Sequence, residues 1–249
     1  ALGGSATNDG GLGMLVALGA KAIDKAGNTL SPIGGNLKSI ARLELHNLDP
    51  RLEACHFLLA CDVDNPLTGT QGASAIFGPQ KGGTADQITA LDHGMQNWAE
   101  ILNETFGREV ADIAGSGAAG GLAAAFLAAF DTTLKPGAEQ VLDILEFDRK
   151  CGSVDWVITG EGCLDSQSVS GKTPVGVARR AKQFGIPVVA FAGKLGDGYE
   201  AVYEEGIDLA LCITPETMTS QEALSLAETN LANATHALIK LIFSTNQEA

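Results

Sequence analysis

Basic residues are scarce in this chain. Its 249 residues include 16 Lys and Arg against 30 Asp and Glu, which gives a formal net charge of −14. Neither lysine nor arginine occurs between Lys194 and Lys240. Proteins that bind nucleic acids or anionic membranes need a basic surface, so we expect this protein to bind neither. Any anionic ligand must then be held by a few local cations and by backbone N–H groups.

The cysteine and histidine patterns of disulfide-rich and zinc proteins are also missing. The five cysteines are odd in number and include no C-x-x-C pair, which favours a reduced, cytoplasmic setting. The four histidines lack the spacing of metal ligands, so we expect no zinc site. The most apolar run, Gly117 to Phe130, is too short to cross a bilayer, and we expect no signal peptide at the start.

Aromatic residues make up only 5% of the chain, whereas glycine accounts for 31 residues. With 45% hydrophobic and 18% charged residues, the composition is that of a globular protein and not of a disordered one. The glycines are scattered, which excludes a collagen-like repeat. In a globular chain, many glycines indicate tight turns where backbone approaches backbone or a ligand.

Strands and helices alternate in the second part of the chain. Strands are expected at 155–159, 186–192 and 208–214, with helices at 174–184 and 199–205 between them. Ser220 is expected to cap a long final helix. This alternation predicts an α/β fold with βαβ units on a parallel sheet. In such sheets ligands bind beyond the carboxyl ends of the strands, which is where the loop 160–173 would lie.

The first part of the chain is less regular. We expect one buried strand there, over 57–63. Helices are expected over 12–20, 86–106, 118–130 and 136–148. No internal repeat is present. The expected domain boundary lies near residue 150, which gives domains 1–150 and 151–249.

The first candidate ligand loop is GGSATNDGG, residues 3–11. Glycines, hydroxyls, an amide and a carboxylate stand together ahead of a helix, a combination that suits an anion or a polyol. The alternative is an ordinary helix-capping turn, but such a turn rarely needs paired glycines at both ends.

The second candidate is ACDVDNPLTG, residues 60–69. Asp62 and Asp64 at the end of a strand could hold Mg²⁺ or substrate hydroxyl groups. An Asx-turn before Pro66, built on Asn65 and Asp64, explains the same residues equally well.

The third candidate, GSGAAGG over 115–121, matches the G-x-G-x-x-G pattern of dinucleotide-binding proteins. That fingerprint needs a flanking βαβ unit, whereas here the helix after the motif is expected to lead through Pro136 into another helix. A dinucleotide-dependent oxidoreductase is therefore the weaker interpretation. Close helix packing and a phosphate-binding role for Gly115, Gly117 and Gly120 remain as hypotheses.

The fourth candidate, TGEGCLDSQSVSGKTP over 159–174, is the most informative stretch. A strand–loop–helix setting that ends in Gly-Lys-Thr resembles a P-loop, but the leading glycine would have to stand at Ser166. The loop is longer than a P-loop and contains Glu161 and Asp165 ahead of Lys172. One lysine at a helix start and two carboxylates suit phosphoryl transfer, in which a cation neutralises phosphate and a carboxylate holds Mg²⁺ or accepts a proton.

Together with FGPQKG (residues 77–82), these four stretches resemble, in order, the glycerate kinase family of bacterial glycerate and glyoxylate metabolism. The resemblance covers essentially the whole chain. It implies ATP- and Mg²⁺-dependent phosphorylation of D-glycerate, with 2-phosphoglycerate the favoured product. It also implies a flavodoxin-like α/β domain, built from both ends of the chain, into which a second α/β domain is inserted. Residues 1–150 would form most of the inserted domain, and 151–249 the C-terminal part of the first. The resemblance leaves homo-oligomerisation open.

The resemblance also assigns roles to residues. Asp165 would be the general base or a Mg²⁺ ligand, with Glu161 as its partner. Lys172 and Ser168, with the backbone at Gly160 and Gly162, would contact phosphate or the substrate carboxylate. Substrate contacts from the other domain would come from Thr7, Asn8, Asp9, Asp62 and Asn65, and nucleotide contacts from Lys81, Gly115, Gly117 and Gly120.

Two departures from the family pattern stand out. Family members have a substantial segment before GGSATNDGG, so we expect the chain to be a fragment, and a non-catalytic nucleotide-binding fragment is the main alternative to an active kinase. The residue after Gly-Glu-Gly is usually basic in the family but is Cys163 here, which weakens any phosphate contact assigned to that position.

Overall fold

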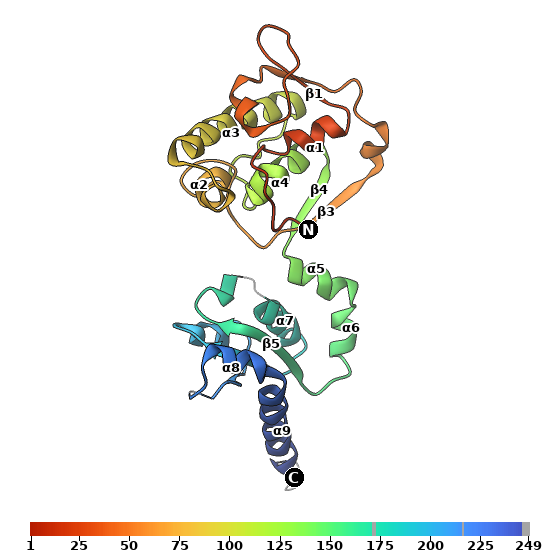
Figure 1. Cartoon of the computed structure of the whole chain (residues 1–249). Helices are drawn as coiled ribbons and strands as arrows, with labels where there is room; N and C mark the ends of the chain where they lie inside the picture. The colour runs from red at the N-terminus through yellow and green to blue at the C-terminus, as the bar shows by residue number, and fades with distance from the viewer. Residues whose placement is uncertain (171–172, 216, 246–249) are drawn as a thin grey trace. The chain divides into compact units, whose positions relative to one another are not determined.

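The computed structural model describes residues 1–170, 173–215 and 217–245, and these form two compact units (Figure 1). The first unit comprises Ala1–Gly137 and the second Ala138–Ala249. The division therefore falls ahead of the boundary expected near residue 150. The reason is that the segment after residue 137 packs with the second unit, where Arg180 bonds to Asp143 and Asp148.

Small sheets and a large helical core make up the first unit. Its elements in chain order are α1 (Leu12–Ala17), β1 (Lys21–Ile23), η1 (Gly34–Ser39), β2 (Arg42–Glu44), η2 (Pro50–Ala54), β3 (His56–Ala60), α2 (Ala73–Phe77), η3 (Pro79–Lys81), α3 (Ala85–Phe106), α4 (Ala118–Ala129) and β4 (Asp131–Lys135). Strands β1 and β2 pair antiparallel, and β3 and β4 pair parallel.

The long helix α3 organises this unit. A capping box starts it, because the Thr84 side chain accepts from the Gln87 N–H while the Gln87 side chain accepts from the Thr84 N–H. On its buried face Trp98 is fully enclosed, and its indole N–H donates to the Gly10 carbonyl at 2.8 Å. Helix α3 thus fixes the N-terminal glycine loop against the core.

A parallel three-stranded sheet forms the centre of the second unit. Its elements are α5 (Gly137–Ile144, which begins at the last residue of the first unit), α6 (Phe147–Cys151), β5 (Val157–Leu164), η4 (Ser168–Ser170), α7 (Thr173–Lys182), β6 (Val188–Leu195), η5 (Tyr199–Tyr203), β7 (Leu209–Cys212), α8 (Ser220–Ser225) and α9 (Ala227–Thr245). The strand order is β5-β6-β7. The expected mixed α/β fold with parallel pairing is confirmed.

Residues of the middle strand β6 alternate between two cores. Val188 and Ala190 pack in the cluster that contains Val175 and Ala178 of α7, while Val189 packs with Leu238 of α9. Helices therefore cover both faces of the sheet at β6. This burial on both sides explains why the sequence of the strand is a continuous apolar run.

Several predicted boundaries were wrong. Strand β5 does not end before Gly160 but continues to Leu164, because its pairing with β6 continues through Glu161 and Cys163. The helix expected over 136–148 is two helices, separated where Glu146 adopts a left-handed conformation. The final helix is likewise divided after Ser225, and the residue that caps its first part is Thr219, not Ser220.

Two further expectations were also wrong. The segment expected to be a helix over 199–205 is the 3₁₀-helix η5. A strand, β4, comes after α4 where a second helix was expected. The presence of β4 removes one objection to a dinucleotide fingerprint at 115–121, but the chain still enters this motif from the loop after α3 and not from a strand.

An ion-pair network joins α5, α6 and α7. Arg180 makes a bidentate pair with Asp148, both bonds at 2.8 Å, and a third bond to Asp143 at 2.9 Å. Its side chain is only 17% exposed. The network holds the first two helices of the second unit against α7.

We predict that Arg180→Met lowers the free energy of unfolding of the second unit by about 1 kcal/mol, since a bidentate, largely buried guanidinium contributes more than an exposed pair. Urea titrations followed by tryptophan fluorescence measure the change. Arg149→Met is the matched control, because Arg149 pairs with Glu146 with its side chain 75% exposed. Equal stability of the Arg180 variant and the wild type would contradict the assigned role.

Candidate functional site

Three of the predicted glycine loops meet within the first unit. The Gly10 N–H donates to the Gly120 carbonyl at 2.9 Å, and the Gly117 N–H donates to the Asn65 carbonyl at 3.0 Å. We call the assembly of residues 3–11, 60–69 and 115–121 the glycine junction. The structure thus brings together loops that are more than 100 residues apart at their extremes.

Glycine is required inside this junction because backbones touch there. A Cβ atom at Gly120 would lie 2.1 Å from the Thr7 carbonyl oxygen, and one at Gly117 would lie 2.2 Å from the Pro66 carbonyl oxygen. Both glycines are buried. Close packing therefore accounts for Gly117 and Gly120, and the nucleotide contacts assigned to them and to Gly115 stay predictions.

The polar side chains of the first loop have partners in the fold. Asp9 accepts hydrogen bonds from the N–H groups of Gly11 at 3.1 Å and Gly13 at 2.9 Å, so it caps α1. The Asn8 amide nitrogen donates to Ser74 Oγ at 2.9 Å. Asn8 Oδ1 is buried and has no hydrogen-bond partner among the described residues. The turn thus bonds to N–H groups at the start of α1 through Asp9, and it also contains a buried acceptor, Asn8 Oδ1, without a hydrogen bond among the described residues.

Lys81 connects the FGPQKG segment to the glycine junction. Its ammonium donates to Ser5 Oγ at 3.0 Å and to the Thr7 carbonyl at 2.6 Å. Burial lowers the pKa of Lys81, and the nearby charge of Asp9 opposes that shift. The lysine therefore sets the conformation of the loop that carries Thr7.

Asp62 and Asn65 serve the backbone in the second loop. Asp62 Oδ1 accepts from the Gly137 N–H at 2.7 Å at the start of α5. The Asn65 amide donates to the Gln71 carbonyl at 2.8 Å, which differs from the expected Asx-turn. The substrate contacts predicted for these two residues stay predictions.

In the second unit, Asp165 stands directly after β5, at the carboxyl edge of the sheet. Its Oδ1 accepts from the Gln167 N–H at 3.0 Å and from Ser168 Oγ at 3.2 Å, while its own N–H donates to Ser168 Oγ at 3.0 Å. Ser168 is fully buried, whereas Asp165 is half-buried. The turn holds the carboxylate in a fixed orientation at the place where parallel sheets bind ligands.

The other predicted residues of this loop lie on the strand. Gly160, Glu161 and Gly162 belong to β5, and Glu161 is exposed with Oε1 accepting from the Gly162 N–H at 3.1 Å. Lys172 lies outside the residues that the structure describes. Within that described part no group of three or more His, Cys, Asp or Glu side chains could hold a metal ion.

Lys194 was not among the site residues predicted from the sequence. It is the β6 partner of Cys163, at the same edge of the sheet, and its side chain is exposed. Because partners on adjacent strands point to the same face, the ammonium lies on the face that carries Cys163. The Cys163 thiol is 4.0 Å from Asp165 Oδ2. The signal in the sequence was a lysine near the end of an otherwise apolar strand.

Within the described residues, no helix combines the length and apolarity needed to cross a bilayer.

Comparison with known proteins gives a consistent result. A sequence model described as "Glycerate kinase family" matches residues 1–243. A glycerate kinase of Halalkalibacterium halodurans is 48% identical over 94% of this chain and 61% of its own length. A glycerate 2-kinase of Escherichia coli is 44% identical over 94% of this chain and 61% of its own length.

Solved structures agree with these sequence matches. A Salmonella typhimurium LT2 crystal structure assigned as glycerate kinase 2 superimposes with a TM-score of 0.83 and 41% identity, covering 99% of this chain and 64% of that one. The chain thus spans about 60% of the length of the curated relatives it matches.

Proposed function

Because the chain belongs to the glycerate kinase family, we propose that the protein transfers the γ-phosphoryl group of ATP to a hydroxyl group of D-glycerate. The observation that carries the proposal is the fixed Asp165 carboxylate at the carboxyl edge of the parallel sheet. The favoured product is 2-phosphoglycerate, a choice supported by the name of one relative, a glycerate 2-kinase.

Asp165 is assigned as the general base. It takes the proton from the attacking hydroxyl while that oxygen bonds to the γ-phosphorus and the bond to the bridging β–γ oxygen breaks, which releases ADP. Hydrogen bonds from the Gln167 N–H and from Ser168 Oγ to Oδ1 fix the orientation of this carboxylate. Fixing the base beforehand lowers the entropy cost of reaching the reactive geometry.

Mg²⁺ binding fits this donor set. Magnesium sites commonly use one or two carboxylates together with phosphate oxygens, so no three-residue cluster is needed, and with Asp165 as the base Glu161 is the proposed ligand. When bound, the ion would neutralise charge on the phosphates. Ser168, Lys172 and the backbone at Gly160 and Gly162 are assigned to the phosphate or to the substrate carboxylate.

The first unit is assigned a supporting role. Thr7, Asn8 and Asp9 remain proposed substrate contacts. Lys81 fixes the carbonyl of Thr7, and the buried unpartnered Asn8 Oδ1 is an acceptor that a hydroxyl group could satisfy. Asp62 and Asn65 are proposed as further contacts from the loop after β3.

An assay of the full-length protein tests the function. ADP formation is measured with ATP, MgCl₂ and D-glycerate, with L-glycerate and lactate as controls, and ³¹P NMR identifies the product. We expect turnover with D-glycerate only and a 2-phosphoglycerate signal. No ADP formation with any of the acids would overturn the proposed function, and 3-phosphoglycerate would overturn only the choice of hydroxyl. Running the 249-residue chain in parallel shows whether it is active by itself.

Lys194 is proposed to bind the carboxylate of glycerate. It would supply the positive charge that the basic residue usual at position 163 supplies in the family pattern and that Cys163 lacks.

We predict that Lys194→Ala raises KM for D-glycerate by about tenfold with a smaller effect on kcat, as expected for the loss of one charged hydrogen bond. Lys194→Arg should retain most of the affinity. Lys150→Ala, an exposed lysine in the same unit, is the control. An unchanged KM in the alanine variant would rule out the contact.

A further inference from the structure

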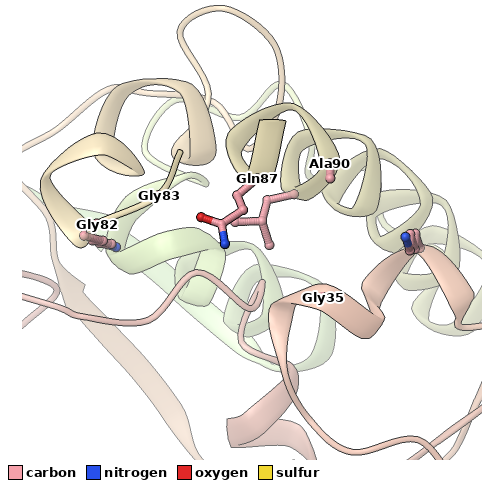
Figure 2. Close-up of a pocket in the computed structure, with 8 residues that line it drawn as sticks. Gly35, Gly82, Gly83, Gln87 and Ala90 are labelled. Carbon is pink, nitrogen blue, oxygen red and sulfur yellow. The ribbon is translucent and has the colours of Figure 1, made fainter. Parts of the chain in front are cut away.

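A pocket of about 390 Å³ lies in the first unit between η1, η3 and the start of α3 (Figure 2). Figure 2 shows the Gln87 side chain reaching from α3 into the space between Gly35 and the Gly82–Gly83 turn. The eight residues that line the pocket are Gly35, Lys38, Lys81, Gly82, Gly83, Gln87, Ala90 and Leu91. No proposed contact to glycerate is among them.

The charge of this pocket differs from that of the chain as a whole. Two of its lining residues, Lys38 and Lys81, are cationic and none of the eight is acidic, although acidic residues outnumber basic ones by 30 to 16 in the sequence. In a protein of net charge −14, such a surface attracts anions locally.

Hydrogen-bond donors are available on several sides of the pocket. Gln87 Oε1 accepts from the Thr84 N–H at 2.9 Å, so its amide nitrogen is left with two donors and has no partner among the described residues. Lys38 is exposed and also has no partner in that part of the chain. Lys81 is fixed by Ser5 and Thr7, which keeps the positive charge at the pocket wall.

Other walls leave room for a larger ligand. A Cβ atom at Gly82, where φ is +86°, or at Gly35 would meet no atom within 4 Å. The space beside both glycines is therefore open, and a ligand can approach their backbone closely. Ala90 and Leu91 supply apolar surface. The volume lies in the range of pockets that hold small organic ligands, about 300–1,000 Å³, and exceeds what a single phosphate needs.

We propose that this pocket binds the polyphosphate chain of the nucleotide, with the adenine ring packed against Ala90 and Leu91. The inference rests on the proposed function for the presence of a nucleotide. The pocket contributes cations and amide donors to the phosphates and contains no carboxylate to accept a proton. It is therefore assigned to nucleotide binding and not to proton transfer.

NMR titration of the ¹⁵N-labelled 249-residue chain tests the pocket directly, with Mg·ATP and, separately, inorganic tripolyphosphate as probes. We expect shifts at the amides of Gly35, Gly82 and Gly83 and at the Gln87 side chain with both probes. Shifts at Ala90 and Leu91 should appear with ATP alone. Shifts that cluster elsewhere, or the absence of binding, would overturn the proposal.

Substitution provides the second part of the test. Lys38→Glu should weaken ATP binding by about tenfold or more, since it replaces an attractive charge with a repulsive one. Lys25→Glu makes the same change of charge at an exposed position outside the pocket and should change affinity by less than about twofold. Ala90→Trp should fill the apolar side and weaken ATP binding more than tripolyphosphate binding. If Lys38→Glu binds ATP with the affinity of the wild type, the assignment of this pocket to the nucleotide is overturned.

Failure of the pocket and failure of the proposed function give different results. If the full-length protein phosphorylates glycerate but Lys38→Glu leaves its KM for ATP unchanged, the function stands and the pocket assignment falls. If both probes bind at the pocket but no glycerate is phosphorylated, the pocket stands as a polyphosphate site and the function falls.

Discussion

Asp165→Asn in the full-length protein is expected to lower kcat by about a thousandfold, within the range of about 10²–10⁴ that a general base contributes. The substitution is a clean probe because asparagine retains an Oδ1 acceptor for the Gln167 N–H and Ser168 Oγ. The turn should therefore persist while the proton acceptor is lost. Steady-state kinetics with D-glycerate measure the effect, and circular dichroism checks the fold.

Two further variants separate chemistry from loop geometry. Ser168→Ala removes one bond to the carboxylate but leaves the base in place, so we expect a smaller loss of kcat, about tenfold. Asp155→Asn changes an exposed acid ahead of β5, away from the carboxyl edge of the sheet, and should have no effect. If Asp165→Asn retains more than a tenth of wild-type kcat, Asp165 is not the base.

Gly120→Ala is expected to cause the largest loss of stability. At this position φ is +69° and a methyl group would lie 2.1 Å from the Thr7 carbonyl oxygen. A left-handed non-glycine residue costs about 1–3 kcal/mol, and forcing apart packed groups costs about as much again. We therefore predict a loss of about 3 kcal/mol or more for the first unit.

Fluorescence of Trp98 reports this loss if Trp156, the tryptophan of the second unit, is first replaced by phenylalanine. Trp98 is fully buried in the first unit, whereas Trp156 is 40% exposed. Gly82→Ala is the matched control, because φ there is +86° but a methyl group would meet open space, so only about 1 kcal/mol should be lost. Comparable losses in the two variants would show that packing at Gly120 contributes little.

Local patterns in the sequence predicted the elements that are buried or strongly capped. The apolar run of β6 and the amphipathic helix α3 were found close to their observed bounds. Strand β4, Asp-Thr-Thr-Leu-Lys, was missed because it is short, largely polar and only partly buried. Its strand conformation comes from parallel pairing with β3, a contact between residues 75 apart in the chain.

The candidate site shows the same dependence on local sequence. Glycine-rich stretches signalled the loops of the glycine junction and the turn at Asp165, because those residues are adjacent in sequence. The contribution proposed for Lys194 depends on the register between β5 and β6. The pocket at Lys38 and Lys81 joins residues more than 40 positions apart. Tertiary packing creates both features, so the lysine near the end of the apolar strand signalled Lys194 itself but not its position beside Cys163, and no local pattern indicated the pocket.

The glycine junction also constrains how this sequence can evolve. Outside the junction, a Cβ atom at Gly94 would lie 3.2 Å from the Leu37 Cβ atom, a contact that a shift of a few tenths of an ångström relieves. A Cβ atom at Gly117 would instead meet a backbone carbonyl, which no second mutation can shorten. Alanine is therefore expected to replace Gly94 in some homologues. Gly117 should remain invariant with no covarying partner.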